Sequence, residues 1–122
     1  MVKRMTKSEE QVMTLLWRSE KPLSCSEIVA LSENKTWKDS YVHSLIKSLI
    51  KKGIVKIESF ELVSRSYARK FVPKISYHEY VLLSYFSEER LKDVGEMSEF
   101  IRLILSYSNT PRLKEAVREI VS

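Results

Sequence analysis

The sequence predicts a mainly helical fold with one small β-hairpin, and three observations support this prediction. Apolar residues recur at helical spacing along most of the chain. Two runs of alternating and β-branched residues, IVKIESF and SYARKFVP, lie together near its middle. Three segments have the spacing of a helix capping box: Thr6-Lys7-Ser8-Glu9, Ser24-Cys25-Ser26-Glu27 and Ser76-Tyr77-His78-Glu79.

The first capping box predicts a helix over residues 7–18. Its apolar residues at helical spacing are Val12, Met13, Leu15, Leu16 and Trp17. A turn at residues 21–23 follows and leaves room for a very short strand. The second capping box predicts a short helix that ends before the polar segment 32–35. Both helices begin at a side chain that can accept a hydrogen bond from the first helical turn.

A third helix is predicted over residues 39–52, with Thr36-Trp37-Lys38-Asp39 at its start. Two lysines and then Gly53 mark its end, because bases favour the last turn and glycine takes the left-handed position after it. Its apolar stripe, which we expect to face the core, consists of Val42, Leu45, Ile46, Leu49 and Ile50.

The two β-type runs predict a hairpin with a polar loop at residues 62–65. The third capping box then predicts a helix that runs to about Val94 and is stopped by Gly95. A further helix is expected at about 97–107, and a last one after Thr110, with Pro111 in its first turn. Three helices followed by a hairpin form the winged helix-turn-helix arrangement, so we predict a winged-helix DNA-binding domain at 1–75 and a helical dimerisation region at 76–122.

The positive charge is concentrated in one part of the chain. The formal net charge is +5, yet residues 35–75 alone hold ten Lys and Arg against three acids, a net of +7. Such an asymmetry favours a polyanionic partner, most simply nucleic acid. A basic surface that only keeps the protein in solution is the alternative.

The polar face of the third helix consists of side chains that can donate hydrogen bonds. No carboxylate interrupts this face after Asp39, whereas a solvated helix usually alternates Glu with Lys. Ser48 falls on the same face, and Lys70 in the hairpin could reach a flanking backbone. We expect Tyr67 and Phe71 to be strand residues that pack on the helices, with a DNA contact as the alternative. Trp37 is expected in the core, and the alternative is that it stacks against the sugar-phosphate chain. The predicted DNA-binding residues are Lys38, Ser40, Tyr41, His43, Ser44, Lys47, Lys51, Arg65 and Arg69.

The two runs TKSEEQVMTLLW and SCSEIVALSENKTWKDSYVHSLIKSLIKKGIVKI extend up to about residue 57. They resemble the penicillinase-repressor and methicillin-resistance-repressor family (BlaI/MecI/CopY) of winged-helix regulators. A stretch of the form E-x-x-V-M-x-x-x-W opens that family's domain, and Glu9, Val12, Met13 and Trp17 match it. The family's recognition helix resembles residues 41–53, YVHSLIKSLIKKG, although Tyr41 and His43 replace the threonine and arginine that are more usual in the family.

The resemblance implies a bacterial repressor that binds a palindromic operator as a homodimer held by its C-terminal helices. The apolar stripes of these helices agree with that implication, and a fold in which they pack on their own chain is the alternative. The predicted dimerisation residues are Tyr80, Leu83, Phe100, Ile101, Ile104, Leu113, Val117 and Ile120.

Two regulatory features of the family find no match in this sequence. Copper-responsive members carry paired cysteines near the C-terminus, whereas the one cysteine of this chain is Cys25. β-Lactam-responsive members are cleaved at an Asn-Phe bond, and the matching position here is Leu103-Ile104. The inducing signal, a protease or a ligand, therefore stays open.

The sequence does not predict an enzyme. Two glycines cannot build a phosphate-binding loop, and His43, His78 and Cys25 lack metal-ligand spacing, so no cofactor and no metal are expected. A lone cysteine, no signal peptide and no long apolar run indicate a cytoplasmic protein without membrane contact. The alternatives to a sequence-specific repressor are a winged-helix module for protein–protein interaction or scaffolding, and a non-specific architectural DNA binder.

Overall fold

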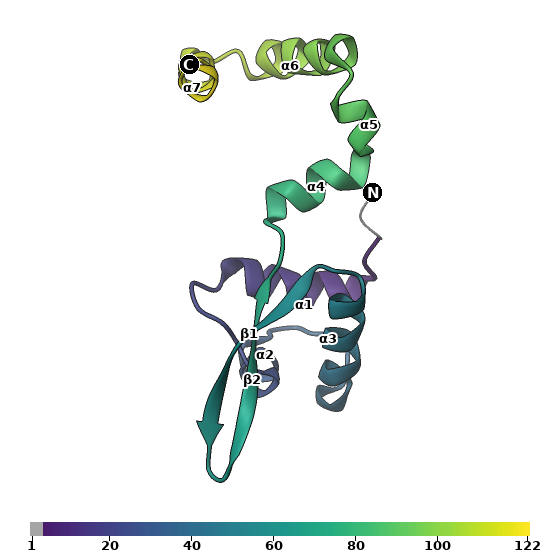
Figure 1. Ribbon diagram of the computed structural model, residues 1–122, viewed down its shortest axis with the longest axis vertical. Helices are drawn as coiled ribbons and strands as arrows, with labels where there is room; N and C mark the ends of the chain where they lie inside the picture. The colour runs from purple at the N-terminus through teal and green to yellow at the C-terminus, as the bar shows by residue number, and fades with distance from the viewer. Residues whose placement is uncertain (1–3) are drawn as a thin grey trace. The chain divides into compact units, whose positions relative to one another are not determined.

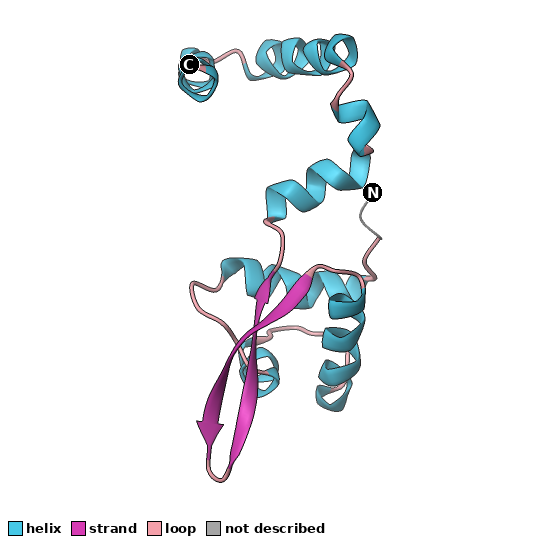
Figure 2. Ribbon diagram, viewed as in Figure 1, coloured by secondary structure: helices cyan, strands magenta, loops and turns pink. Residues whose placement is uncertain are grey.

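The computed structural model describes residues 4–122, which fall into two compact units (Figure 1). The first unit ends at Ser84 and the second begins at Tyr85. The first contains the hairpin and most of the packed helices, and the second is entirely helical (Figure 2). Each unit is described by itself.

Helices α1 (Lys7–Arg18) and α2 (Cys25–Leu31) begin where the capping boxes predict. The Thr6 hydroxyl accepts from the Glu9 amide at 3.2 Å, and the Thr6 amide donates to the Glu9 carboxylate at 2.8 Å. Ser24 and Glu27 exchange the same pair of bonds at the start of α2. These reciprocal bonds satisfy amide groups that a helix start otherwise leaves unpaired.

The third helical segment consists of a 3₁₀ turn, η1 (Asp39–Tyr41), and helix α3 (Val42–Lys51). Its first helical residue is Asp39, which confirms the predicted start, and no side chain caps this end. Trp37 is only 7% exposed and lies in the core, as predicted. Gly53 adopts a left-handed φ of 76°, which confirms the predicted helix end.

Strands β1 (Val55–Val63) and β2 (Ser66–Pro73) pair antiparallel and form a longer hairpin than predicted. The expected loop at 62–65 is wrong, because Val63 pairs with Ser66 across a two-residue turn in which Ser64 has a φ of 58°. A bulge interrupts the register between Ile57 and Ser59. The predicted very short strand is present as a bridge between Leu23 and Phe71.

One hydrophobic core joins α1, α2, α3 and the base of the hairpin. Phe71, at 1% exposed, is among its largest fully buried side chains, as predicted. Two expectations about burial are wrong. Ile50 is 38% exposed at the edge of the apolar stripe, and Tyr67 is 67% exposed because β2 extends beyond the helices there. The buried members are Met5, Val12, Met13, Leu16, Leu23, Ile28, Trp37, Val42, Leu45, Ile46, Leu49, Ile54, Val55 and Phe71.

Helix α4 (Tyr77–Tyr85) is joined to the core by Trp17. The indole N–H of Trp17 donates to the Ile75 carbonyl at 3.0 Å. The Trp17 ring lies edge-on to Tyr77, with 5.4 Å between ring centroids, and 5.7 Å from Tyr80. The start of α4 is thereby held against α1 by one hydrogen bond and aromatic contacts.

The segment after α4 differs most from the prediction. In place of one helix to Val94, α5 (Glu88–Leu91) and α6 (Val94–Ser108) follow, and then α7 (Pro111–Val121). Ser87 caps α5, and the Asp93 side chain accepts from the Glu96 amide at 3.0 Å to cap α6. Gly95 therefore lies inside α6 and does not stop a helix. Left-handed Asn109 ends α6, and Pro111 opens α7 as predicted.

Candidate nucleic-acid interface

Helix α3 separates its apolar and polar side chains onto two faces. Val42, Leu45, Ile46 and Leu49 are buried in the core. All nine predicted DNA-binding residues are exposed, including Lys38 and Ser40 before the helix and Arg65 at the turn of the hairpin. The face that the sequence predicts for recognition is therefore turned away from the core and is available to a partner.

One acid lies at the start of this face, and it is paired. The Asp39 carboxylate forms an ion pair with Lys35, four positions earlier in the chain, at 2.6 Å. Along α3 itself, the exposed polar side chains are neutral donors or bases, among them His43, Ser44 and Lys47. Such a surface suits base-edge acceptors and phosphate oxygens.

A buried carboxylate fixes α3 against α1. Glu9 is 2% exposed and accepts from Lys52 Nζ at 2.6 Å and from Ser48 Oγ at 2.7 Å. Burial raises the pKa of Glu9, but the hydrogen bonds from Lys52, Thr6 and Ser48 outweigh it and lower that pKa from 4.5 to about 2. Ser48, expected on the polar face, instead points inward to Glu9.

The sequence does not predict this anchor, because Glu9 stands out there only as a member of a capping box and of the family's opening motif. The acid is the same residue that closes the box at Thr6, and it reaches Lys52 more than forty positions along the chain. No local pattern joins the two. The anchor sets the C-terminal end of α3 and thereby the direction of its exposed face.

The hairpin bases have different surroundings. Arg65 lies at the tip, and the Arg69 guanidinium lies 5.8 Å from the centre of the Phe71 ring. Lys70 is ion-paired to Glu27 and, at 2.6 Å, to Glu61, so it is not free to reach a DNA backbone. The hydrogen bond from Lys70 is the main cause that lowers the pKa of Glu27 to about 2.

A hollow of about 490 Å³ separates α3 from the hairpin. Its lining residues are Cys25, His43, Ile46, Lys47, Ile50, Ile57 and Arg69. Burial raises the pKa of the Cys25 thiol, and the charge of Arg69 opposes that rise. No acidic residue lines this hollow.

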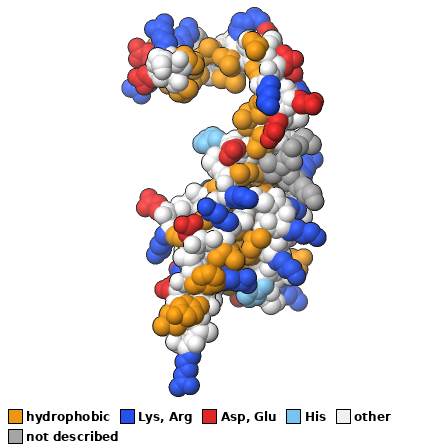
Figure 3. Space-filling view, in the orientation of Figure 1, with side chains coloured by type: hydrophobic (Ala, Val, Ile, Leu, Met, Phe, Trp, Pro, Cys, Tyr) orange, Lys and Arg blue, Asp and Glu red, His pale blue; other side chains and the backbone are white. Residues whose placement is uncertain are grey.

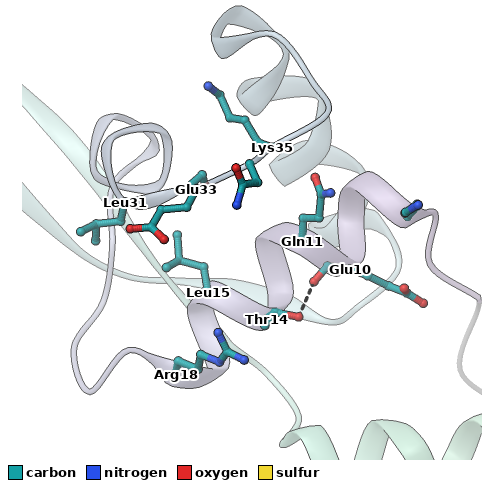
Figure 4. A pocket seen from close by; sticks show the side chains of 11 residues that line it. Glu10, Gln11, Thr14, Leu15, Arg18, Leu31, Glu33 and Lys35 are labelled. Atoms are coloured by element: carbon teal, nitrogen blue, oxygen red, sulfur yellow. Dashed lines mark hydrogen bonds between the residues drawn. The ribbon is translucent and has the colours of Figure 1, made fainter.

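A second hollow, of about 480 Å³, lies beside α1 and the segment after α2 (Figure 4). Its lining mixes acids and bases, since Glu10 and Glu33 as well as Arg18 and Lys35 belong to it. Such a lining has no preference for a ligand of one charge.

The predicted dimerisation residues have three kinds of surroundings. Tyr80 packs on Trp17 of its own chain, which accounts for its partial burial. Phe100 lies edge-on to Phe86, with 4.9 Å between ring centroids. Leu83, Leu113 and Val117 are half-buried, while Ile101, Ile104 and Ile120 are exposed.

Within residues 4–122, no group of three or more His, Cys, Asp or Glu side chains could hold a metal ion. In that same part of the chain, no helix is long and apolar enough to cross a membrane.

Three helices, a hairpin and a basic donor face on the third helix define a winged helix-turn-helix protein of the DNA-binding class. The penicillinase repressor profile matches residues 5–98. The chain belongs to this family of DNA-binding transcriptional regulators, as its first half had led us to expect.

The other comparisons add little. Among solved structures, the ferric uptake regulator Fur of Helicobacter pylori is similar, with 20% identity and a TM-score of 0.40 over 70% of this chain and 71% of that chain. A similarity of this size supports no inference. No curated protein matches the sequence.

Proposed function

We propose that the protein is a sequence-specific repressor that binds double-stranded DNA as a homodimer, with α3 in the major groove of a palindromic operator. One observation carries the proposal: the exposed face of α3 holds hydrogen-bond donors and bases without an unpaired acid, directly opposite its buried stripe. Repression would follow because a protein seated on a promoter excludes the transcription machinery. In this proposal residues 1–75 bind DNA and 76–122 dimerise.

The two ends of the face have different roles. Ser40, Tyr41, His43 and Ser44 lie in the first turns, where a helix end can reach base edges. Basic side chains contact phosphates, and these contacts position the protein without reading the base sequence. They are Lys38, Lys47 and Lys51 in and before α3, and Arg65 and Arg69 in the hairpin.

The second unit supports a homodimer. From Tyr85 to Ser122 no residue is buried, although α6 and α7 carry many large apolar side chains. Ile101 is 51% exposed and Ile104 is 56% exposed on one face of α6. Apolar area of this kind is stabilised when another surface removes it from water, and a second copy is the simplest one to supply it. Two-fold symmetry of the protein then calls for an inverted repeat in the operator.

Selection of bound fragments from random double-stranded DNA, followed by sequencing, tests the proposal. We expect an inverted repeat whose half-sites lie about one helical turn or more apart. A bound pool without any motif would leave only an architectural role, and no bound pool would refute DNA binding by α3. A variant with Lys47 and Lys51 both changed to Ala should enrich nothing.

Sedimentation equilibrium tests the dimer separately. Ile104→Asp places a charge in the exposed apolar face of α6 and should shift the protein to monomer, because an unpaired charge cannot be covered at low cost. Ser106→Asp adds the same charge at another exposed position of α6 and serves as the matched control. A dimer that tolerates both changes equally would remove α6 from the interface.

A protein-interaction module is the second candidate, and the hairpin supplies the observation in its favour. Phe60, Leu62 and Tyr67 are exposed along it, where hydrophobic side chains gather on the surface (Figure 3). A mobility shift with unselected DNA at low salt separates the candidates, since a scaffold without DNA affinity gives no shift.

A further inference from the structure

The hollow between α3 and the hairpin has an apolar floor. Ile46 is buried at its bottom, and Ile50 and Ile57 face it from the two elements, at 38% and 40% exposed. Phosphate contacts need no apolar floor, so these isoleucines leave room for a ligand that has a hydrocarbon part. The Cys25 thiol, half-buried, adds a further soft and apolar wall.

The rim of the same hollow is cationic. Lys47 and His43 extend from α3 and Arg69 from β2. None of the three takes part in an ion pair with any residue from 4 to 122, in contrast to Lys52 and Lys70 close by. The rim therefore offers an arginine fork and an ammonium to an anion, above a surface that favours hydrocarbon.

We propose that this hollow binds a small amphipathic carboxylate, with its carboxylate between Arg69 and Lys47 and its hydrocarbon body over Ile46, Ile50 and Ile57. The volume of about 490 Å³ lies within the roughly 300–1,000 Å³ of small-molecule sites. A neutral hydrocarbon would leave the rim unpaired, and a small hydrophilic anion would leave the floor uncovered. The combination selects a ligand that carries both features.

Binding here would displace DNA. The regulatory consequence rests on the proposed function, because His43, Lys47 and Arg69 are then also DNA contacts. A carboxylate that occupies these side chains removes them from the operator, so the ligand and DNA exclude each other. The site would make the protein a repressor that releases its operator directly when an amphipathic acid accumulates.

The lone cysteine gives a site-specific test on the full chain without DNA. Decanoate is the probe, and the rate at which Cys25 is alkylated by N-ethylmaleimide is the readout. Saturating decanoate should slow alkylation several-fold, because the ligand covers the thiol. Decanol and acetate, which lack the charge or the hydrocarbon body, should protect weakly or not at all. Equal protection by decanol and decanoate, or no protection by decanoate, would overturn the proposal.

Matched variants locate the ligand. Arg69→Gln should weaken decanoate protection about tenfold or more, the size of one lost charge-assisted bond, whereas Arg65→Gln at the hairpin tip should leave protection unchanged. Ile57→Ser should weaken it, while Leu62→Ser, on the same strand but outside the hollow, should not. Variants that all behave as the parent protein would refute this location for the ligand.

Two separate readouts keep the inference distinct from the proposed function. Thiol protection without any effect of decanoate on operator binding would overturn displacement. If the parent protein does not bind an operator, yet decanoate still protects Cys25, the proposed function is refuted and the ligand site is not.

Discussion

The Glu9→Gln substitution removes the buried negative charge that joins α1 to α3. In the folded chain that charge is stabilised by Lys52 at 2.6 Å, by Ser48 at 2.7 Å and by the Thr6 amide. Glutamine has nearly the same shape, so the change tests the charge rather than the packing. It leaves the Lys52 ammonium, whose side chain is 18% exposed, without its partner.

The magnitude follows from the pKa of Glu9, which falls from 4.5 to about 2 on folding. At about 1.4 kcal/mol for each pH unit, the ionised form stabilises the fold by about 3 kcal/mol at neutral pH. Because the folded pKa lies below the unfolded one, this contribution is complete above pH 4.5 and is lost as the pH falls toward 2. By pH 3, roughly 2 kcal/mol of it is gone.

Urea unfolding followed by tryptophan fluorescence is the assay. Both tryptophans, Trp17 and Trp37, lie in the first unit, so the signal reports on the unit that contains Glu9. At pH 7 the variant should unfold about 1–2 M earlier than the parent protein, for a dependence of about 2 kcal/mol per M. At pH 3 the difference between the two midpoints should shrink to about 0.5 M, because about 1 kcal/mol of the contribution is left at that pH.

Glu10→Gln is the matched control, because Glu10 is the exposed neighbour on the same helix and its change should shift neither curve appreciably. If Glu9→Gln lowers the free energy of unfolding equally at pH 7 and at pH 3, the reasoning is refuted. Such a loss would come from packing, because a packing contact does not depend on the ionisation of Glu9. A deficit below about 0.5 kcal/mol at pH 7 would show that the charge pair only offsets its own desolvation.

Further substitutions test the helix end and the DNA-facing surface. Gly53→Ala should destabilise the first unit by about 1 kcal/mol in the same urea assay, because Gly53 has a φ of 76° while an added Cβ would meet no atom within 4 Å. Gly95→Ala, at a helical position without positive φ, should cause no such loss. Lys47→Ala and Lys51→Ala should each lower the slope of log K against log salt by about 1, on every DNA sequence, and an unchanged slope in a salt titration would remove that lysine from the phosphate contacts. His43→Ala should instead change the preference between operator and random DNA by about 1–3 kcal/mol in competition binding, and equal losses on both DNAs would exclude base reading by His43.

The sequence by itself determined the parts of the fold that depend on neighbouring residues. The boxes at Thr6–Glu9 and Ser24–Glu27 place the starts of α1 and α2, since both partners of each bond lie within four positions. The sequence also predicted the apolar stripe of α3 and the end of the helix at Gly53, because helical spacing and a left-handed glycine are local properties. The winged-helix order of elements follows from these signals.

Tertiary structure alone decided which side chains those elements cover. Ile50 and Tyr67 were expected in contact with the helices, yet the first lies at the rim of the core and the second on a strand that extends beyond it. The spacing of apolar residues predicts which face of a helix or strand is apolar, but it does not predict how far along that face the packed core extends. The bond between Glu9 and Lys52, and the hollow between α3 and the hairpin, join residues far apart in the chain. Only the folded core brings such residues together, because their spacing carries no local signal.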